Sequence, residues 1–176
     1  MCSITERGHP CPQSLRSKLK AVGASRSSGQ RCPRSIKATL KIKIKEAQVS
    51  EIVAHATCAA PNECCGLIGG DHDGDARTIY RTRNIALNPL VTYEAAPEDL
   101  FAAQRKMRDR GERLIAIYHS HPRSANPEPS ATDVRLAYYP SAVYLIVGLG
   151  NDEPCVRAFR IDEREGWEAI EYQIVD

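Results

Sequence analysis

The second half of the sequence contains a group of residues that could bind a metal ion, namely His119, His121, Ser130 and Asp133. The apolar residues 115–118 precede the first histidine and predict a buried strand. Because alternate side chains of a strand share a face, His119 and His121 are expected to point the same way. Two imidazoles and one carboxylate are three of the four ligands of a tetrahedral zinc site, in which a catalytic centre leaves the fourth position to water.

The residues after the histidines predict a loop followed by a helix. Pro122 has no N–H and ends the strand, and the Pro- and Ser-rich residues 123–129 must form a loop. Ser130 then fits the N-cap of a helix that continues through Ala137, with Asp133 at the third helical position. Each feature alone has an ordinary structural explanation, as a capping box or as surface or core histidines. The combination favours a metal site.

The complete pattern is His119-x-His121-Pro122, seven residues, Ser130, two residues and Asp133. It resembles the motif of the JAMM (MPN+) metalloproteases, the JAB-domain family. That motif also has an upstream glutamate, and Glu63 in the segment PNECCGLIGG (residues 61–70) stands in its place. The similarity extends over roughly residues 40–175, and the chain resembles the short stand-alone members found in prokaryotes.

The resemblance implies a fold and a set of roles. The family fold is α/β (α+β), a mixed curved β-sheet flanked by helices that is similar to the fold of cytidine deaminases. The zinc ligands would be His119, His121 and Asp133. Glu63 would act as general base and then general acid, and Ser130 would donate a hydrogen bond to the tetrahedral oxyanion. A zinc ion lowers the pKa of its bound water to about 7, so a nearby carboxylate can take the proton.

The resemblance also implies a substrate class, because stand-alone relatives hydrolyse an amide bond after the C-terminal Gly-Gly of a ubiquitin-like or sulfur-carrier protein. Residues 134–142 contain no Cys or His, and therefore no second zinc site of the kind that some deubiquitinating relatives carry. We expect neighbouring strands and the loop of residues 123–129 to form a narrow groove that admits an extended tail. The folded body of the substrate would dock on the helix of residues 97–110.

Other functions remain open at this point. Some relatives are general, cell-wall or phage-tail metallopeptidases, and others are non-catalytic MPN scaffolds that have lost metal ligands. All five motif residues are present here, which favours a catalyst over a scaffold. The DNA-repair-associated RadC proteins share the His-x-His pair, but their additional helical DNA-binding region has no counterpart in this sequence.

Charge divides the sequence into two parts. Residues 1–37 contain eight of the 24 Lys and Arg residues and one of the 22 acidic residues, so residues 38–176 carry 16 basic and 21 acidic groups. An acidic domain does not favour nucleic-acid binding. We predict a disordered basic tail over residues 1–37 and one metalloprotease domain over residues 38–176. Whether the tail is a transit peptide or an over-extended translation start stays open.

The seven cysteines include no Cys-x-x-Cys pair, which favours reduced thiols and a cytoplasmic location. Cys64, Cys65 and Cys155 are expected to be small buried residues. No apolar stretch approaches the roughly 18 residues that span a bilayer, so we expect a soluble protein with no membrane partner. The oligomeric state is not predicted.

Hydrophobic periodicity predicts the remaining elements. Helices are expected at residues 46–59 and 97–110, strands at residues 39–44, 63–70, 78–86, 143–149, 156–161 and 167–175, and a short extended piece at residues 91–94. Strands interrupted by two or three helices predict a mixed sheet packed against helices.

Overall fold

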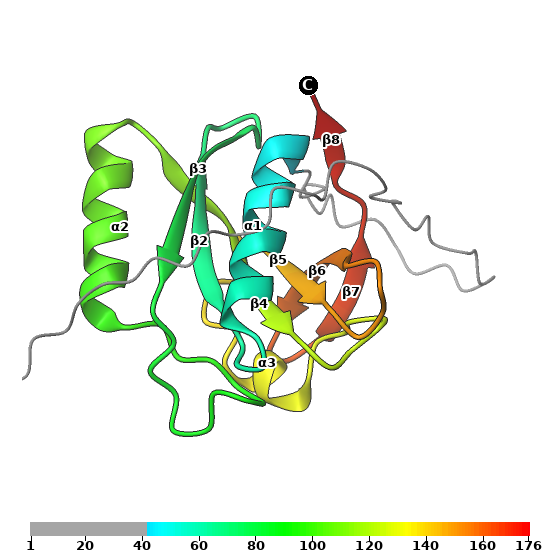
Figure 1. Cartoon of the computed structure of the whole chain (residues 1–176). Coiled ribbons are helices and arrows are strands. Elements are labelled where there is room, and N and C mark those ends of the chain that lie inside the picture. Colours follow the sequence, from blue (N-terminus) through cyan, green and yellow to red (C-terminus); the bar gives the residue numbers. More distant parts are fainter. Residues whose placement is uncertain (1–41) are drawn as a thin grey trace, which may run out of the picture.

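The computed structural model describes residues 42–176, so the predicted tail and the start of the first predicted strand lie outside the described residues. The elements follow in the order β1 (Lys43–Lys45), α1 (Glu46–Ala59), β2 (Cys65–Gly70), β3 (Ala76–Thr82), α2 (Pro97–Asp109), β4 (Arg113–His121), α3 (Ala131–Arg135), β5 (Val143–Gly148), β6 (Cys155–Asp162), β7 (Gly166–Ile170) and β8 (Gln173–Val175) (Figure 1). Within this range, no helix combines the length and the apolar character needed to cross a membrane.

Six strands form a mixed sheet in the order β3-β2-β4-β5-β6-β7. β4 and β5 run parallel, and each of the other neighbouring pairs is antiparallel. A parallel pair needs a connection that leaves the sheet, and here that connection carries α3. This α/β architecture, a mixed sheet flanked by helices, confirms the fold class predicted from the sequence.

The two long helices cover opposite faces of the sheet (Figure 1). Successive side chains of β4 point to opposite faces of the sheet, so this strand contributes to the core on each face. Ala116 and Tyr118 join the core that includes α1, whereas Ile117 joins the core that includes α2. His119 and His121 follow Ile117 by two and four residues along the strand, so their side chains lie on the same face as Ile117, the α2 face.

Two predicted strands are wrong in extent. The strand expected over residues 167–175 is interrupted after Ile170, and β8 leaves the sheet to pair in parallel with β1. The strand expected over residues 78–86 ends at Thr82, and the piece expected over residues 91–94 is loop. The cause is Asn84, whose side-chain oxygen accepts hydrogen bonds from two backbone N–H groups, at residues 86 and 94, and folds this segment into a loop.

A close packing contact joins the sheet to α1. The ring of Tyr118 lies over Gly66 on the neighbouring strand, where an added Cβ would be 2.4 Å from the Tyr118 Cε1 atom. The Tyr118 hydroxyl lies 2.9 Å from Nδ1 of His55 on α1. His55 is therefore a packing residue.

The close contact between Tyr118 and Gly66 predicts that adding one methyl group at residue 66 destabilises the fold. Gly66→Ala should lower the free energy of unfolding by about 1–3 kcal/mol, because overpacking a filled core displaces its neighbours. Combining it with Tyr118→Leu should give less destabilisation than the sum of the two single changes, since the smaller side chain vacates the space. Chemical denaturation of all four proteins measures this coupling, and strict additivity would contradict it.

Candidate functional site

Three potential metal ligands converge at the end of β4. The Nε2 atoms of His119 and His121 lie 3.1 Å apart. Asp133 Oδ1 lies 3.5 Å from Nε2 of His119, and Asp133 Oδ2 lies 3.3 Å from Nε2 of His121. His119 and Asp133 are buried and His121 is partly exposed, so the group has one open side.

Local structure at α3 fixes the aspartate. Ser130 is the N-cap of this helix, and its Oγ accepts a hydrogen bond from the backbone N–H of Asp133 at 3.1 Å. In return, Asp133 Oδ2 accepts a hydrogen bond from the Ser130 backbone N–H at 2.7 Å. This reciprocal capping box, which the sequence predicted, orients the carboxylate towards the histidines. The helix is shorter than expected and ends at Arg135 instead of continuing through Ala137.

The loop between β4 and α3 packs against the end of β5 and the adjoining start of β6. Gly148 allows this close approach, since a Cβ there would lie 2.4 Å from a loop carbonyl oxygen. One Arg157 nitrogen, Nη1, lies within hydrogen-bond distance of Asn126 Oδ1, the Pro127 carbonyl oxygen and Glu128 Oε1, at 3.0–3.1 Å. Residues 123–129 line neither of the two hollows described beside the site, and whether this loop forms a wall of the substrate groove stays a prediction.

Strand register brings Glu63 to the metal-ligand group. Cys65 pairs with His119 in the antiparallel β2–β4 ladder, so Glu63, two residues earlier, comes opposite His121. Glu63 Oε1 lies 4.0 Å from Nε2 of His121. The Glu63 side chain is buried, and its Oε2 atom has no hydrogen-bond partner among the described residues.

The backbone on both sides of Glu63 is held by hydrogen bonds. The Glu63 N–H donates to the carbonyl oxygen of Pro89 at 2.7 Å, and Asn84 Nδ2 donates to the Glu63 carbonyl oxygen at 2.9 Å. The next residue, Cys64, donates its N–H to Oγ of Ser120 at 2.9 Å. Ser120 thus has a structural role, and as the residue between the two histidines on β4 its side chain lies on the opposite face of the strand. Cys64 and Cys65 are buried as expected, whereas Cys155 is partly exposed, which corrects that prediction.

Electrostatics distinguishes the two carboxylates. Burial raises the pKa of Glu63 to about 7, with a further increase from Asp133 and an opposing effect of His121. Burial alone would raise the pKa of Asp133 as well, but hydrogen bonds from His119 and His121 hold it well below its usual range. Burial lowers the pKa of His119 and favours the neutral imidazole that binds metals. The site therefore combines an anionic ligand with a carboxyl group that can exchange a proton near neutral pH.

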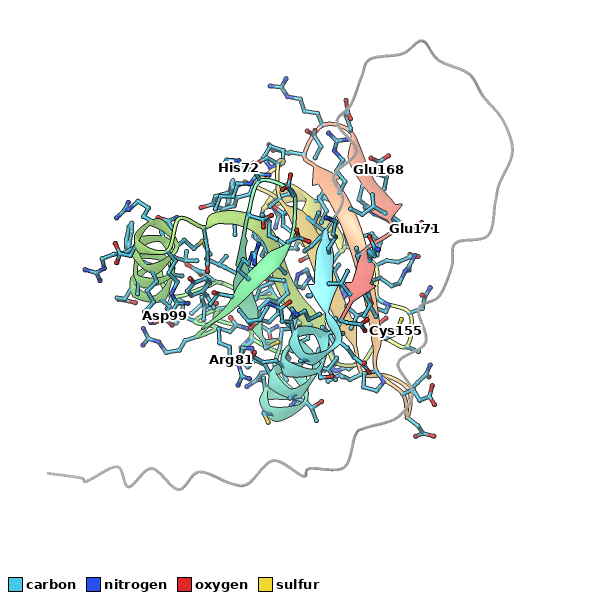
Figure 2. The ribbon with its side chains drawn as sticks, turned by 90° about the horizontal axis from the view of Figure 1, so that it is seen from above. His72, Arg81, Asp99, Cys155, Glu168 and Glu171 are labelled. Atoms are coloured by element: carbon cyan, nitrogen blue, oxygen red, sulfur yellow. The ribbon has the colours of Figure 1, made fainter. Side chains whose placement is uncertain are left out.

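These residues fit a zinc ion by their donor chemistry. Two imidazoles and a carboxylate, all within 4.8 Å of one another, offer the ligand set of catalytic zinc centres. Buried polar atoms are normally paired, so the unpartnered Glu63 Oε2 atom beside them fits a site that admits water or a substrate amide. His72, by contrast, is exposed in the turn between β2 and β3 (Figure 2).

Tyr93 contacts the ligand group, although nothing in the sequence indicated this role. Its ring stacks on His119 with a centroid distance of 4.5 Å and an interplanar angle of 26°. Tyr93 belongs to the β3–α2 loop (residues 83–96), which Asn84 organises by also donating to the Thr92 carbonyl oxygen at 3.1 Å. A lone tyrosine in a segment without periodicity carried no signal of this contact.

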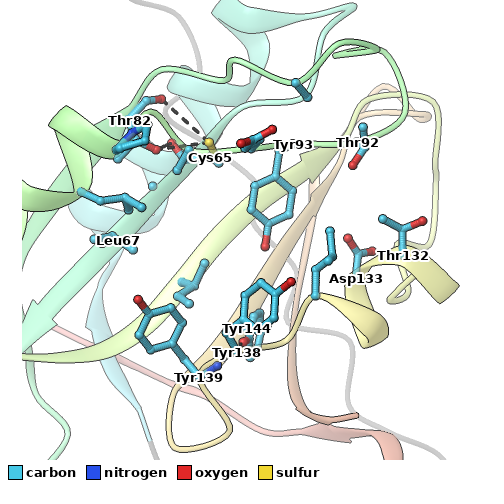
Figure 3. Close-up of a pocket in the computed structure, with 18 of the residues that line it drawn as sticks. Cys65, Leu67, Thr82, Thr92, Tyr93, Thr132, Asp133, Tyr138, Tyr139 and Tyr144 are labelled. Atoms are coloured by element: carbon cyan, nitrogen blue, oxygen red, sulfur yellow. Dashed lines mark hydrogen bonds between the residues drawn. The ribbon is translucent and has the colours of Figure 1, made fainter.

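A cavity of about 700 Å³ adjoins the site on the α2 face. Strands β2, β4 and β5 contribute to its lining, as do the β3–α2 loop and the α3–β5 loop (residues 136–142), which face each other across it (Figure 3). Tyr93 and Asp133 line the cavity as well as taking part in the site, so the two are continuous. Substrate can therefore approach the histidines from this side.

The profile of a family described as prokaryotic homologues of the JAB domain matches residues 45–162. The chain belongs to this family. It is 40% identical over 102 residues to a desampylase of Haloferax volcanii, covering 54% of the chain and 71% of that protein. It is 32% identical over 124 residues to a probable TtuB-protein conjugate cleaving protease of Thermus thermophilus, covering 70% of the chain and 78% of that protein.

The fold is shared with a solved relative. The solution structure of a Desulfitobacterium hafniense protein superposes with a TM-score of 0.68 at 34% sequence identity, covering 77% of this chain and 93% of the other. Together, the profile and this structure confirm the JAB resemblance that the motif indicated. The chain is thus a prokaryotic-type JAB domain, whose relatives include peptidases.

The geometry predicts metal content directly. The purified protein should contain about one zinc ion per chain, and His119→Ala or Asp133→Asn should each remove most of it, because two remaining ligands hold zinc weakly. His72→Ala, in the exposed turn, is the matched control and should keep its zinc. Elemental analysis after dialysis against a chelator measures the difference. Undiminished zinc in the His119 variant would contradict the assignment.

Proposed function

We propose that this chain is a zinc-dependent peptidase that hydrolyses the amide bond directly after the C-terminal Gly-Gly of a ubiquitin-like or sulfur-carrier protein. The observation that carries the proposal is the position of Glu63, a buried carboxyl group 4.0 Å from a histidine of the ligand group. A non-catalytic scaffold has no need for this fifth residue. The Thermus relative is named as a protease that cleaves protein conjugates, which supports the same reaction class.

Glu63 is suited to move a proton in both directions. A bound zinc ion would supply a Lewis acid and a water with a pKa of about 7. Glu63 takes a proton from the attacking water and returns it to the leaving amine nitrogen, which requires a carboxyl group that is neither always charged nor always neutral. Burial, which raises the Glu63 pKa to about 7, provides that property.

In the proposed reaction, Ser130 stabilises the negative oxygen that develops on the substrate carbonyl. Its Oγ accepts a hydrogen bond from the Asp133 backbone N–H and so keeps its own proton available for donation. The Ser130 side chain is exposed next to the ligand group, where a substrate can reach it. Losing such a donor typically lowers kcat by about 10²–10³.

The crowding around the ligand group supports a preference for glycine. The stacked ring of Tyr93 and the carboxylate of Asp133 both border the approach to His119. A residue without a side chain passes between such groups most easily, and an amide bond preceded by two glycines can reach the histidines in extended form. The body of a ubiquitin-like protein would then remain outside, beside the cavity.

The role of Glu63 can be separated from metal binding. Glu63→Gln should lower kcat by about 10²–10⁴, because it keeps the shape of the side chain and removes its basicity. Zinc content and melting temperature should stay near those of the wild type. Glu51→Gln, which alters an exposed ion pair with Arg81, is the control and should retain full activity. Wild-type turnover in the Glu63 variant would place the base elsewhere.

The substrate class is tested with fusions of a ubiquitin-like protein that end in Gly-Gly and continue into a short peptide. Mass spectrometry should find cleavage directly after the second glycine. Replacing that glycine by alanine should lower kcat/KM at least about tenfold, because the added Cβ meets the crowded approach. Equal cleavage of unstructured peptides without Gly-Gly would instead favour a general metallopeptidase.

A further inference from the structure

The cavity beside the ligand group has the size and lining of a side-chain binding pocket. Its volume of about 700 Å³ falls within the usual range for ligand sites of about 300–1,000 Å³. Leu67 of β2, Ile117 of β4 and Tyr144 of β5 contribute to the lining, and Leu100 of α2 adds another apolar side chain. The close-up shows that the hydroxyl end of Tyr93 points into this space (Figure 3). The cavity is therefore an apolar extension of the site.

The position of Glu63 shows which part of a substrate faces this cavity. Glu63 is not among the described residues that line it, but contributes to a separate hollow of about 560 Å³. That hollow is lined partly by His55 and Ala59 of α1, on the face of the sheet opposite the histidines. The leaving amine must lie within reach of Glu63 to receive its proton, and Glu63 does not line the apolar cavity, so the leaving segment lies beside the cavity and not in it. The apolar cavity consequently faces the acyl segment, upstream of the bond that is cut.

The rim of the cavity provides independent support. Leu87 is fully exposed and Tyr138 is 74% exposed, although both line the cavity. They lie on the two loops that face each other across it, the β3–α2 loop and the α3–β5 loop. Large exposed apolar side chains around a pocket commonly mark a binding surface. A chain that enters between the loops would cover both residues.

Charge restricts the occupant further. The only charged residues among those that line the described cavity are Glu94 and Asp133, both acidic. An acidic side chain placed there would lose its hydration and meet the negative charge of Glu94, whereas the charge of Asp133 would be compensated by the zinc ion that it binds. The cavity therefore selects against aspartate and glutamate as well as for apolar groups.

We propose that this cavity is a specificity subsite that binds a bulky aliphatic or aromatic side chain located three to five residues before the cleaved bond. This inference rests on the proposed function and names a substrate feature beyond Gly-Gly. An extended tail advances about 3.3 Å per residue, and these positions lie two to four residues from the one that carries the scissile carbonyl, so they are roughly 7–13 Å from it. The two glycines occupy the crowded approach, and the first large side chain upstream enters the pocket.

The test uses the ubiquitin-like fusions, with leucine, alanine or aspartate placed in turn at the third, fourth and fifth positions before the cleaved bond. At one of these positions leucine should raise kcat/KM at least about tenfold over alanine, and aspartate should lower it below alanine. Peptides that end in Gly-Gly and carry the same replacements should bind to the Glu63→Gln protein in the same order. Fluorescence anisotropy measures this binding without turnover.

Substitutions at the rim test whether the preference for leucine arises in this cavity. Leu87→Asp and Tyr138→Asp should reduce the preference for leucine over alanine, and since both side chains are exposed, the melting temperature should not change. Ile174→Asp is the matched control, because this residue is 39% exposed on β8 and lies outside the cavity lining. It should leave the preference intact.

The possible failures can be distinguished. Cleavage after Gly-Gly at equal rates for leucine and alanine at all three positions would overturn the subsite and leave the proposed function standing. A leucine preference that persists unchanged in both rim variants would also overturn it. No cleavage of any fusion by the zinc-loaded protein would overturn the proposed function, and the subsite with it.

Discussion

The register between β2 and β4 is the constraint on which the site depends. Pairing of Cys65 with His119 brings Glu63 opposite His121, and the hydrogen bond from the Cys64 N–H to Ser120 Oγ fixes the same alignment at the end of the ladder. A slip by one residue would move the strand's side chains to the other face of the sheet. Glu63 would then point away from the site, while His119 and His121 would remain in place.

The surrounding structure protects this alignment from two sides. Asn84 makes hydrogen bonds to Glu63 and to the β3–α2 loop, so the loop that carries Tyr93 and the strand that follows Glu63 are tied together. On the other side, Arg157 holds the loop that leads to Asp133 against the sheet. Such hydrogen bonds determine how accurately the reactive groups are placed, because neighbouring side chains and backbone fix the orientation of each metal ligand.

Residue spacing in the sequence predicted the parts of the site that depend on a single strand or a single helix end. Strand geometry explains why His119 and His121 point to the same face of the sheet, and helix capping explains the contact between Ser130 and Asp133. The proximity of Glu63 could be expected only from the family motif, since strand register is a property of the folded sheet.

Other features depend on tertiary contacts that no spacing in the sequence encodes. The stacking of Tyr93 on His119 requires a loop shape set by one asparagine side chain, and the cavity lies between that loop and the α3–β5 loop, which come together only in the folded chain. The failed strand prediction at residues 83–86 has the same origin, because a side-chain hydrogen-bond pattern overrode the local preference for extended backbone.

The parallel pairing of β4 with β5 also has a consequence for the order in which the site is assembled. During synthesis, the histidines of β4 appear before Asp133, and Asp133 appears before the strand that covers the open edge of β4. Parallel neighbours separated by a crossover form late, because the intervening loop must close first. A chain made only as far as β4 therefore lacks Asp133, and a chain made as far as α3 has all three ligand residues but an uncovered central strand. The ligand group is therefore held between neighbouring strands only after β5 has joined β4.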